Sequence, residues 1–417
     1  MPTLTVFLNG EQVGTLEQAS TTRFSYSEQW LTKSEPFPLS LSMPLRPGLQ
    51  TQRATLAWVE GLLPSSWEVR SRLAEAGGVK LTNPVALLGT VGLDCPGAVQ
   101  VCEERAATEI TEQQGSLEPV DDGWIEGRLE ALAEDASSWY LADERWSLGG
   151  GQAKFPLYRS ADGAWSRAHG SQPTTHIFKP GVRGVRLLAL NEHICLSALG
   201  KVGLLVARTE YLRFGALSAT VVERFDRHRQ QDGTVVREHQ EDCCQALGST
   251  VAYETSGGPS ATQICDVLRT EAVDDSGKRF AEALVAGYLL GATDGHARNY
   301  SIKLWPGGTR LAPLYDVASA LPYERDPFNP LASRKIAMAI CGERVIGAVT
   351  SAHWEKWAKL NRIDPAWLMD RIHVLATTLP AAIEDSFAQL DSDDDTLSLR
   401  SRLLPAIEKN CARALSV

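Results

Sequence analysis

The sequence predicts an α+β protein in which a strand-rich part is followed by a helix-rich part. Residues 1–140 mix strand and helix signals, and residues 141–238 contain mostly strand-like segments with one helix. Across residues 239–417, apolar side chains recur every three to four positions, a spacing typical of helices. Because 417 residues exceed what one ordinary core holds, we expect two or three domains and a cleft between unequal halves.

The N-terminal part begins with a predicted β-hairpin, whose strands are LTVFL and EQVGTL. Asn9-Gly10 lies between them and is a favoured two-residue hairpin turn. The alternating segment FPLSLSMPL predicts a further strand, and residues 54–76 show helical spacing that is interrupted at Pro64. Residues 103–123 are polar and acidic, so we expect a linker or an exposed connection there, followed by a short helix.

The central part carries strand-like segments, of which SLGGGQAKFPLYR, TTHIFKP, TEYLRFG and LSATVVERFDR are the clearest. Asp232-Gly233 predicts a second hairpin turn, and LLALNEHICLSALGKVG predicts one helix among these strands. The last part is predicted to be an all-helical lobe. One of its helices should begin at Asp364-Pro365, with the aspartate as the cap and proline in the first turn.

Composition and charge argue against several classes of protein. The net charge of −10 does not suit a protein that coats nucleic acid by itself, although DNA contacts alongside a basic partner remain open. The N-terminus does not resemble a signal peptide, and no window approaches the roughly 18 apolar residues of a membrane span. Eight scattered cysteines form no C-x-x-C pair. We therefore expect a cytoplasmic protein with reduced thiols and no membrane contact.

The stretch GATDGHARNYSIK places Asp294 five residues before Asn299. Protein kinases use this offset in their catalytic loop, where the aspartate orients the substrate hydroxyl and the asparagine binds Mg²⁺. The spacing alone is also compatible with two polar residues in an ordinary turn. Asp316, at the end of the apolar run LAPLYDV, adds a second carboxylate where kinases place a metal ligand, although a carboxylate at the end of a strand would look the same.

Lys179 ends the strand-like segment TTHIFKP, where burial disfavours a lysine unless its ammonium meets an anion. Glu192, in the following helix, is a candidate ion-pair partner, as in the lysine–glutamate pair of kinases. A lysine stem that reaches solvent from a strand end is the alternative.

The three glycines of SLGGGQAK, residues 149–151, could turn backbone N–H groups toward a phosphate, although a flexible hairpin tip would look the same. Downstream, the backbone from Glu223 to Phe225 could hold an adenine edge, although an ordinary strand end would also fit. Each signal is weak alone, but their order along the chain is hard to obtain by chance.

These motifs together resemble the HipA toxin kinases of bacterial type II toxin–antitoxin modules, over nearly the whole chain. The resemblance to the family's N-terminal subdomain lies in the segments PFPLSLSMPLRPG, EGLLPSSWEVR and ALLGTVGLDCPGAV. The resemblance to the family's kinase core lies in the following segments, which occur in the family's order: SLGGGQAKF, THIFKP, NEHICL, ERFDR, EDCCQALG, SGGPS, TDGHARNYSI and LAPLYDVAS. Ala292 and Gly150 depart from the family's pattern, but neither removes a catalytic group.

The resemblance implies a bilobal protein-kinase-like fold with an extra N-terminal subdomain. That subdomain would span residues 1–140, the N-lobe residues 141–238 and the C-lobe residues 239–417. Asp294 would be the catalytic residue, Asn299 and Asp316 would hold Mg²⁺, and Lys179 would contact the α/β-phosphates. The residues implied to line the ATP site are Gly149, Gly150, Gly151, Gln152, Ala153, Lys154, Lys179, Glu223, Arg224, Phe225, His296, Asn299, Tyr315 and Asp316.

The same resemblance implies a serine/threonine protein kinase that arrests growth by phosphorylating a translation component such as an aminoacyl-tRNA synthetase. A HipB-like DNA-binding antitoxin would restrain it at the operator. Ser147 would be autophosphorylated, and the added charge would favour an ejected loop and self-inactivation. A phosphotransferase with a small-molecule or lipid acceptor and a non-catalytic co-repressor module are the alternatives.

Overall fold

The computed structural model describes residues 3–323 and 334–416 and divides the chain into two compact units. Each unit is assembled from separate stretches of chain, so neither is a continuous segment. The first unit contains residues 1–180, 212–250 and 301–308, and the second contains residues 181–211, 251–300 and 309–417.

The first unit begins with a four-stranded antiparallel sheet in the order β3-β2-β1-β4. Its strands are β1 (Thr3–Leu8), β2 (Glu11–Gln18), β3 (Thr22–Tyr26) and β4 (Val99–Cys102). The predicted N-terminal hairpin is confirmed. Asn9 and Gly10 both have positive φ, 50° and 82°, as a tight two-residue turn requires.

Helices cover this sheet with a continuous apolar core that includes Trp58 and Leu88. They are α1 (Glu28–Leu31), α2 (Gln52–Leu62), α3 (Trp67–Gly77) and α4 (Pro84–Val91). The predicted interruption of the helical pattern at Pro64 is confirmed, because α2 ends before it. The hydroxyl of Ser66 then accepts the Val69 N–H and caps α3.

One local prediction in the N-terminal part is wrong, and another is incomplete. The segment FPLSLSMPL forms no strand and makes an isolated bridge between Ser40 and Met43. The N–H groups of Leu39 and Leu41 donate to the side chains of Tyr26 and Glu241 and not to a neighbouring strand. The segment predicted as a linker or an exposed connection is exposed along most of its length, but it also contains η1 (Glu104–Ala106), α5 (Ala107–Thr111) and the strand β5 (Gly115–Val120). Most side chains of β5 are exposed, so the strand shows no apolar alternation and is held by backbone pairing with β7.

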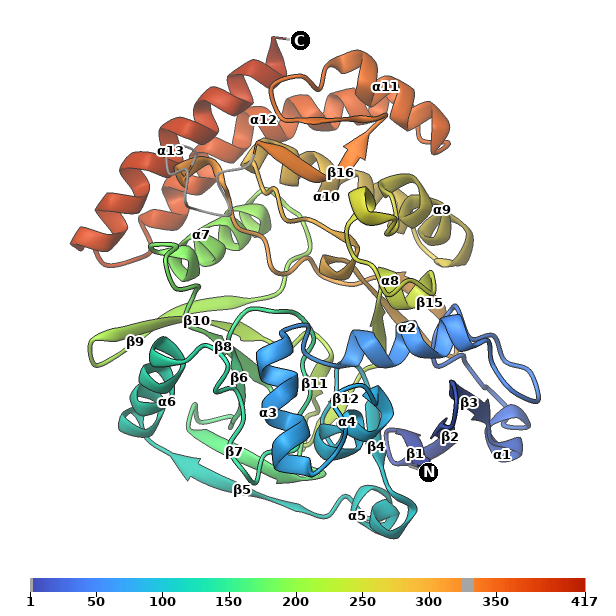
Figure 1. Ribbon diagram of the computed structural model, residues 1–417. Coiled ribbons are helices and arrows are strands. Elements are labelled where there is room, and N and C mark those ends of the chain that lie inside the picture. Colours follow the sequence, from blue (N-terminus) through green and yellow to red (C-terminus); the bar gives the residue numbers. More distant parts are fainter. Residues whose placement is uncertain (1–2, 324–333, 417) are drawn as a thin grey trace. The chain divides into compact units, whose positions relative to one another are not determined.

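A six-stranded sheet follows in the order β5-β7-β6-β8-β10-β9 (Figure 1). Its other strands are β6 (Phe155–Arg159), β7 (Trp165–Gly170), β8 (His176–Lys179), β9 (Thr209–Phe214) and β10 (Leu217–Glu223). Phe155 and Phe178 stack with ring centroids 5.0 Å apart in its core. The short helix expected after the acidic segment is α6 (Asp122–Glu134), which packs on β10.

Short strands complete the first unit. They are β11 (Arg227–Arg229), β12 (Val235–Arg237), β13 (Gln240–Asp242) and β14 (Ser301–Trp305), which continues into β15 (Gly308–Leu311). The predicted hairpin at Asp232-Gly233 is confirmed by the β11–β12 pair, with Gly233 at φ 88°. The four-residue helix α8 (Cys243–Ala246) follows β13.

The second unit is built mainly from helices around the long α12 (Figure 1). They are α7 (Leu188–Lys201), α9 (Ala261–Glu271), α10 (Ser276–Leu290), α11 (Ser351–Leu360), α12 (Pro365–Phe387) and α13 (Asp394–Leu415). The predicted helix start at Asp364-Pro365 is confirmed, because the Asp364 carboxylate accepts the Ala366 N–H at 3.0 Å.

The prediction of an all-helical C-terminal lobe is wrong. Residues 239–417 also contain β13, β14, β15 and the hairpin of β16 (Lys335–Ile340) and β17 (Glu343–Val345). The hairpin turn uses Cys341 at φ 49° before Gly342 at φ 90°, and a cysteine at that position carries no turn signal. The α+β class itself is confirmed, and no described helix is both long and apolar enough to cross a bilayer.

Candidate active site

The second unit brings the predicted catalytic-loop residues together. Helix α10 is followed by Gly291, whose φ of 66° and close approach to Leu321 suit only glycine. The chain then turns tightly, and the Asp294 carbonyl accepts the His296 N–H at 2.7 Å and the Asn299 Nδ2–H at 2.8 Å. The five-residue spacing therefore joins Asp294 and Asn299 on one short loop, and the Asn299 side chain closes it.

Asp316 contributes its charge to the same place. Asp316 has φ 57°, a left-handed conformation that few residues other than glycine adopt. It lies two residues after Leu314, which forms an isolated β-bridge with Val206. The neighbouring Tyr315 donates its hydroxyl to the Arg298 carbonyl at 2.6 Å and ties this segment to η3 (Ala297–Asn299). The predicted metal ligands thus come from two segments that are fastened to each other.

The electrostatics show that the two carboxylates interact. Removal of water raises the pKa of Asp294, and the negative charge of Asp316 raises it further. A hydrogen bond from Tyr253 and the nearby His296 oppose this rise. Two close carboxylates and the oxygen of a buried carboxamide are hard oxygen donors of the kind that Mg²⁺ prefers. Asn299 and Asp316 therefore fit a divalent cation bound to phosphates.

In the first unit, the predicted phosphate loop, residues 147–154, is held against the C-terminal end of α2 and the residues that follow it. The Ser147 hydroxyl donates to the Leu62 carbonyl, and the Gly150 carbonyl accepts the Ser65 N–H at 2.9 Å. A Cβ on Gly149 would lie 2.8 Å from the Gly61 carbonyl oxygen, so only glycine fits there. The glycines therefore permit a close backbone contact as well as a tight turn.

Lys154 stabilises the loop from within. Its buried ammonium donates to the Gly149 carbonyl at 2.9 Å and lies 5.4 Å from the centroid of the Trp139 ring. Gln152 is half-buried and Ala153 is buried beside it. The loop in this state is thus a closed, internally bonded turn.

Lys179 is the last residue of β8 and is buried, opposite Thr220 of β10. Its expected partner Glu192 is buried on α7, which belongs to the second unit. The ion pair between them stays a prediction.

The predicted adenine segment follows β10, where side chains alternate in direction. Glu223 is exposed and Phe225 is half-buried, whereas Arg224 points inward and is buried. The Phe225 carbonyl accepts the Lys303 ammonium at 2.8 Å, which fixes the backbone of this segment. Glu223 and Phe225 are therefore the residues of the segment whose side chains reach the surface.

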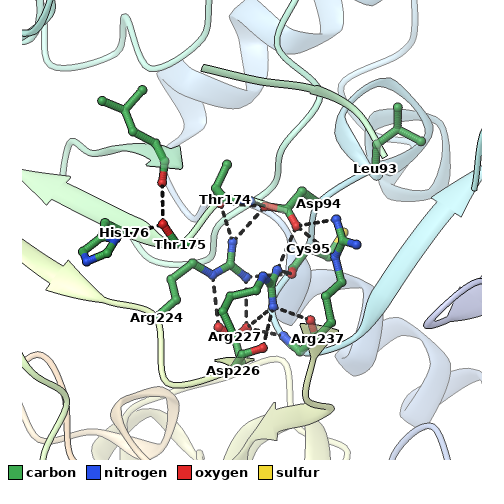
Figure 2. A network of polar contacts seen from close by, with 12 residues as sticks. Leu93, Asp94, Cys95, Thr174, Thr175, His176, Arg224, Asp226, Arg227 and Arg237 are labelled. Carbon is green, nitrogen blue, oxygen red and sulfur yellow. Dashed lines mark hydrogen bonds and ion pairs between the residues drawn. The ribbon is translucent and has the colours of Figure 1, made fainter. Parts of the chain in front are cut away.

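Arg224 belongs to a buried ion network that the sequence did not reveal (Figure 2). Arg224, Arg227 and Arg237 all donate to the Asp94 carboxylate, at 2.8–3.1 Å. Arg224 also forms two hydrogen bonds with the carboxylate of Asp226. Burial alone would raise the pKa of Asp94, but the three guanidinium groups hold it well below its usual range. The network fixes the backbone on either side of Arg224.

Thr174 completes the environment of Asp94, because its N–H and hydroxyl both donate to that carboxylate. Only ERFDR hinted at this network in the sequence, through its alternating charges. Tyr253, whose hydroxyl donates to Asp294, also escaped the sequence analysis, because no spacing rule connects the two residues.

Comparison with known proteins places both parts of the chain in one family. The HipA-like C-terminal domain matches residues 146–383, and the HipA N-terminal domain matches residues 4–102. The putative kinase Y4mE of Sinorhizobium fredii is 34% identical over 367 residues, which cover 85% of each chain. The serine/threonine-protein kinase toxin HipA of Shewanella oneidensis is 26% identical, over 99% of this chain and 96% of its own.

A solved structure of Shewanella oneidensis HipA with HipB and its operator DNA superposes with a TM-score of 0.85 at 26% identity. The superposition covers 99% of this chain and 97% of that chain. The likeness therefore includes the N-terminal region as well as the catalytic loop. The chain is a kinase, and it belongs to the HipA family of toxin–antitoxin kinases.

Proposed function

We propose that the protein is an ATP-dependent serine/threonine protein kinase that arrests growth. In this proposal Asp294 contacts the acceptor hydroxyl, and Asn299 and Asp316 would hold Mg²⁺. Lys179 contacts the α/β-phosphates, and the phosphate loop, Glu223 to Phe225, His296 and Tyr315 line the nucleotide. The bilobal kinase-like fold and the domain bounds 1–140, 141–238 and 239–417 are part of the proposal.

The chemistry needs little covalent help from the protein. The acceptor oxygen forms a bond to the γ-phosphorus while the bond to the β–γ bridging oxygen breaks and ADP leaves. The hydroxyl proton passes to the Asp294 carboxylate, whose raised pKa suits a proton acceptor. When bound, Mg²⁺ neutralises phosphate charge. Most of the rate then comes from positioning and charge, because the transition state is loose.

One observation carries this proposal: Asp294, Asn299 and Asp316 meet around one loop of the second unit. Asn299 is bonded to the Asp294 backbone, and Asp316 interacts electrostatically with the Asp294 carboxylate. A turn with no catalytic role has no reason to hold two carboxylates together against their mutual repulsion.

We also propose the partners and location that family membership suggests. The target is a protein serine or threonine, such as one in an aminoacyl-tRNA synthetase, and a HipB-like antitoxin restrains the kinase and carries it to operator DNA. The net charge of −10 supports DNA contact chiefly through that partner. The protein acts in the cytoplasm.

Labelled phosphate tests the acceptor class directly. The purified protein is incubated with γ-³²P-ATP, MgCl₂ and a cell lysate, and the label is followed in proteins, lipids and metabolites. We expect one or a few labelled protein bands that disappear with Asp294→Asn. Label confined to lipids or metabolites would instead assign a different phosphotransferase. Growth arrest that persists with Asp294→Asn, when no antitoxin is expressed, would favour a non-catalytic co-repressor.

We further propose that Ser147 is autophosphorylated and that this step inactivates the enzyme. Ser147 is fully buried and its hydroxyl donates to the Leu62 carbonyl. A phosphate at this position would face a carbonyl oxygen and carry close to two negative charges. Phosphorylation therefore requires the loop to leave the C-terminal end of α2, and the modified loop cannot return.

Mass spectrometry after incubation with ATP tests this step. We expect a phosphopeptide containing Ser147 whose appearance parallels the loss of kinase activity. Ser147→Ala should abolish the phosphopeptide, and Ser65→Ala is the matched control because Ser65 lies beside the loop at Gly151. Progressive inactivation that continues unchanged in Ser147→Ala would overturn the proposal.

A further inference from the structure

Tyr253 lies against the predicted catalytic residue. Its hydroxyl donates to the Asp294 Oδ1 atom at 2.5 Å, and its ring meets the His296 ring edge to face with centroids 4.7 Å apart. Tyr253 keeps 40% of its surface exposed, which is unusual for a tyrosine so tightly engaged. Among the described residues, the other carboxylate oxygen of Asp294 accepts no side-chain hydrogen bond, so the contact with Tyr253 leaves it open.

The phenol of Tyr253 remains a donor at every physiological pH. Loss of water raises its pKa above the usual range, and the hydrogen bond to Asp294 and the charges of Asp294 and Asp316 raise it further. A neutral phenol donates its proton to an ionised carboxylate, so the contact with Asp294 has a fixed direction.

The loop that carries Tyr253 is shaped by the glycine pair of SGGPS. The Tyr253 carbonyl accepts the N–H groups of both Ser256 and Gly258, at 3.0 and 2.9 Å. A Cβ on Gly258 would lie 2.5 Å from the Val251 carbonyl oxygen and 2.8 Å from that of Tyr253, so no larger residue fits. Gly257, at φ 90°, allows the chain to turn back on itself.

Two contacts fasten the same loop to its surroundings. The Ala252 carbonyl accepts the Ala297 N–H at 3.2 Å, which joins the loop to η3 beside Asp294. On the other side, the Glu254 carboxylate accepts the Ala339 N–H of β16 at 2.6 Å. Tyr253 is therefore held from both sides, and its backbone is linked to the catalytic loop that its hydroxyl contacts.

We propose that Tyr253 is a positioning residue, which holds Asp294 by one carboxylate oxygen and directs the other toward the acceptor hydroxyl, and that Gly257-Gly258 exists to place it. The inference rests on the proposed kinase function and adds to it a residue and a motif with a defined role. Tyr253 contacts the catalytic carboxylate and takes no part in the proton transfer.

Tyr253→Phe removes only the hydroxyl and tests the proposal. We expect kcat for labelling of the lysate protein to fall roughly 10- to 100-fold, the range for a hydrogen bond to a charged group. The KM for ATP and the dissociation constant of mant-ATP with MgCl₂ should stay within about twofold. Tyr288→Phe is the matched control, because it removes a buried hydroxyl that donates to the Ile346 and Val349 carbonyls and not to Asp294.

The outcomes separate the possibilities. An unchanged or raised kcat in Tyr253→Phe would overturn the proposal, and a raised value would mean that Tyr253 obstructs the acceptor. A fall in kcat that is accompanied by weaker ATP binding and a lower thermal midpoint would mean that Tyr253 has a purely structural role. That result would also overturn the proposal. If the wild-type protein labels nothing, the kinase function fails instead, and that result is distinct from any result of the variant.

Gly258→Ala extends the test to the loop. The added methyl group must displace the backbone around Tyr253, so kcat should fall as in Tyr253→Phe. If the glycine acts through the tyrosine, the double variant should be no slower than the slower single variant. If the fold-losses in kcat of the two single variants multiply in the double variant, Gly258 acts independently of Tyr253, and this half of the proposal is overturned. Should Gly258→Ala not fold, Tyr253→Phe still decides the role of the tyrosine.

Discussion

The backbone N–H of Ser147 donates a 3.0 Å hydrogen bond to the carbonyl oxygen of Asp94. Asp94 therefore serves two structures: its backbone holds the start of the phosphate loop, and its carboxylate anchors three arginines. Those arginines include Arg224, which lies between the two predicted adenine residues. The N-terminal domain thus supplies a fixed point for both predicted ATP-binding segments of the first unit.

Asp94→Asn should be strongly destabilising, because it leaves three buried guanidinium groups with one carboxylate, that of Asp226. We expect the free energy of unfolding to fall by about 3–5 kcal/mol, as when one partner of a buried ion pair is removed. Denaturant titration measures this change. Asp135→Asn removes an exposed partner of Arg72 and should leave the midpoint nearly unchanged. An equally small effect at Asp94 would contradict the role we assign to it.

The buried carboxyl group of Glu241 should make the folded state less stable as the pH rises from about 4.5 to about 8. Burial raises the pKa of Glu241 to about 8, against a hydrogen bond from the Leu41 N–H. The folded state therefore prefers the protonated acid. The resulting contribution to the free energy of unfolding is fully present below about 4.5, the pKa of Glu241 in the unfolded chain. It is lost as pH rises through about 8, by an amount on the order of a few kcal/mol.

Thermal midpoints between pH 5 and pH 9 test this prediction. Glu241→Gln cannot ionise and should flatten the decline up to about pH 8, whereas Glu130→Gln, at an exposed position of α6, should leave it in place. A decline that is the same in the wild type and in Glu241→Gln would assign it to other groups.

Gly149→Ala should weaken ATP binding by displacing the phosphate loop. The new methyl group would lie 2.8 Å from the Gly61 carbonyl oxygen, a backbone atom that cannot easily move. We expect the dissociation constant of mant-ATP to rise by roughly tenfold, as for a contact worth about 1.4 kcal/mol. Gly127→Ala, on the exposed face of α6, is the control and should stabilise the helix by about 0.5–1 kcal/mol. Unchanged ATP affinity in Gly149→Ala would argue against the loop as a phosphate site.

Asp316→Asn should raise the Mg²⁺ concentration that gives half-maximal phosphoryl transfer, by at least roughly tenfold. The reason is the loss of one anionic oxygen donor beside Asp294. Titration of MgCl₂ at fixed ATP measures the shift. Asp143→Asn, an exposed carboxylate in the first unit, should not change it. An unaltered Mg²⁺ requirement in Asp316→Asn would remove Asp316 from the proposed ligands.

Sequence analysis succeeded where the determining contacts are local. The spacing from Asp294 to Asn299 lies within one turn, and the Asn9-Gly10 and Asp232-Gly233 hairpins depend on two residues each. It failed where partners lie far apart in the chain. Asp94 and Arg227 are 133 positions apart, and Tyr253 and Asp294 are 41 apart, so no periodicity or spacing could connect them.

Two further errors have physical reasons. Strand β5 has no buried face, so the apolar alternation that identifies strands is absent from it. The turn between β16 and β17 is hard to recognise from the sequence, because its first residue, Cys341, adopts positive φ although it is not a glycine. In both places backbone hydrogen bonds determine the structure, and they leave little trace in side-chain patterns.

The discontinuous first unit has a consequence for synthesis of the protein. Its strand β13 pairs with β14 (Ser301–Trp305), and Lys303 bonds both Glu238 and the Phe225 carbonyl. A ribosome must therefore translate past the whole catalytic loop before the first unit can be completed. Until residue 305 has been added, a nascent chain therefore lacks β14 and both Lys303 contacts, and the first unit stays incomplete.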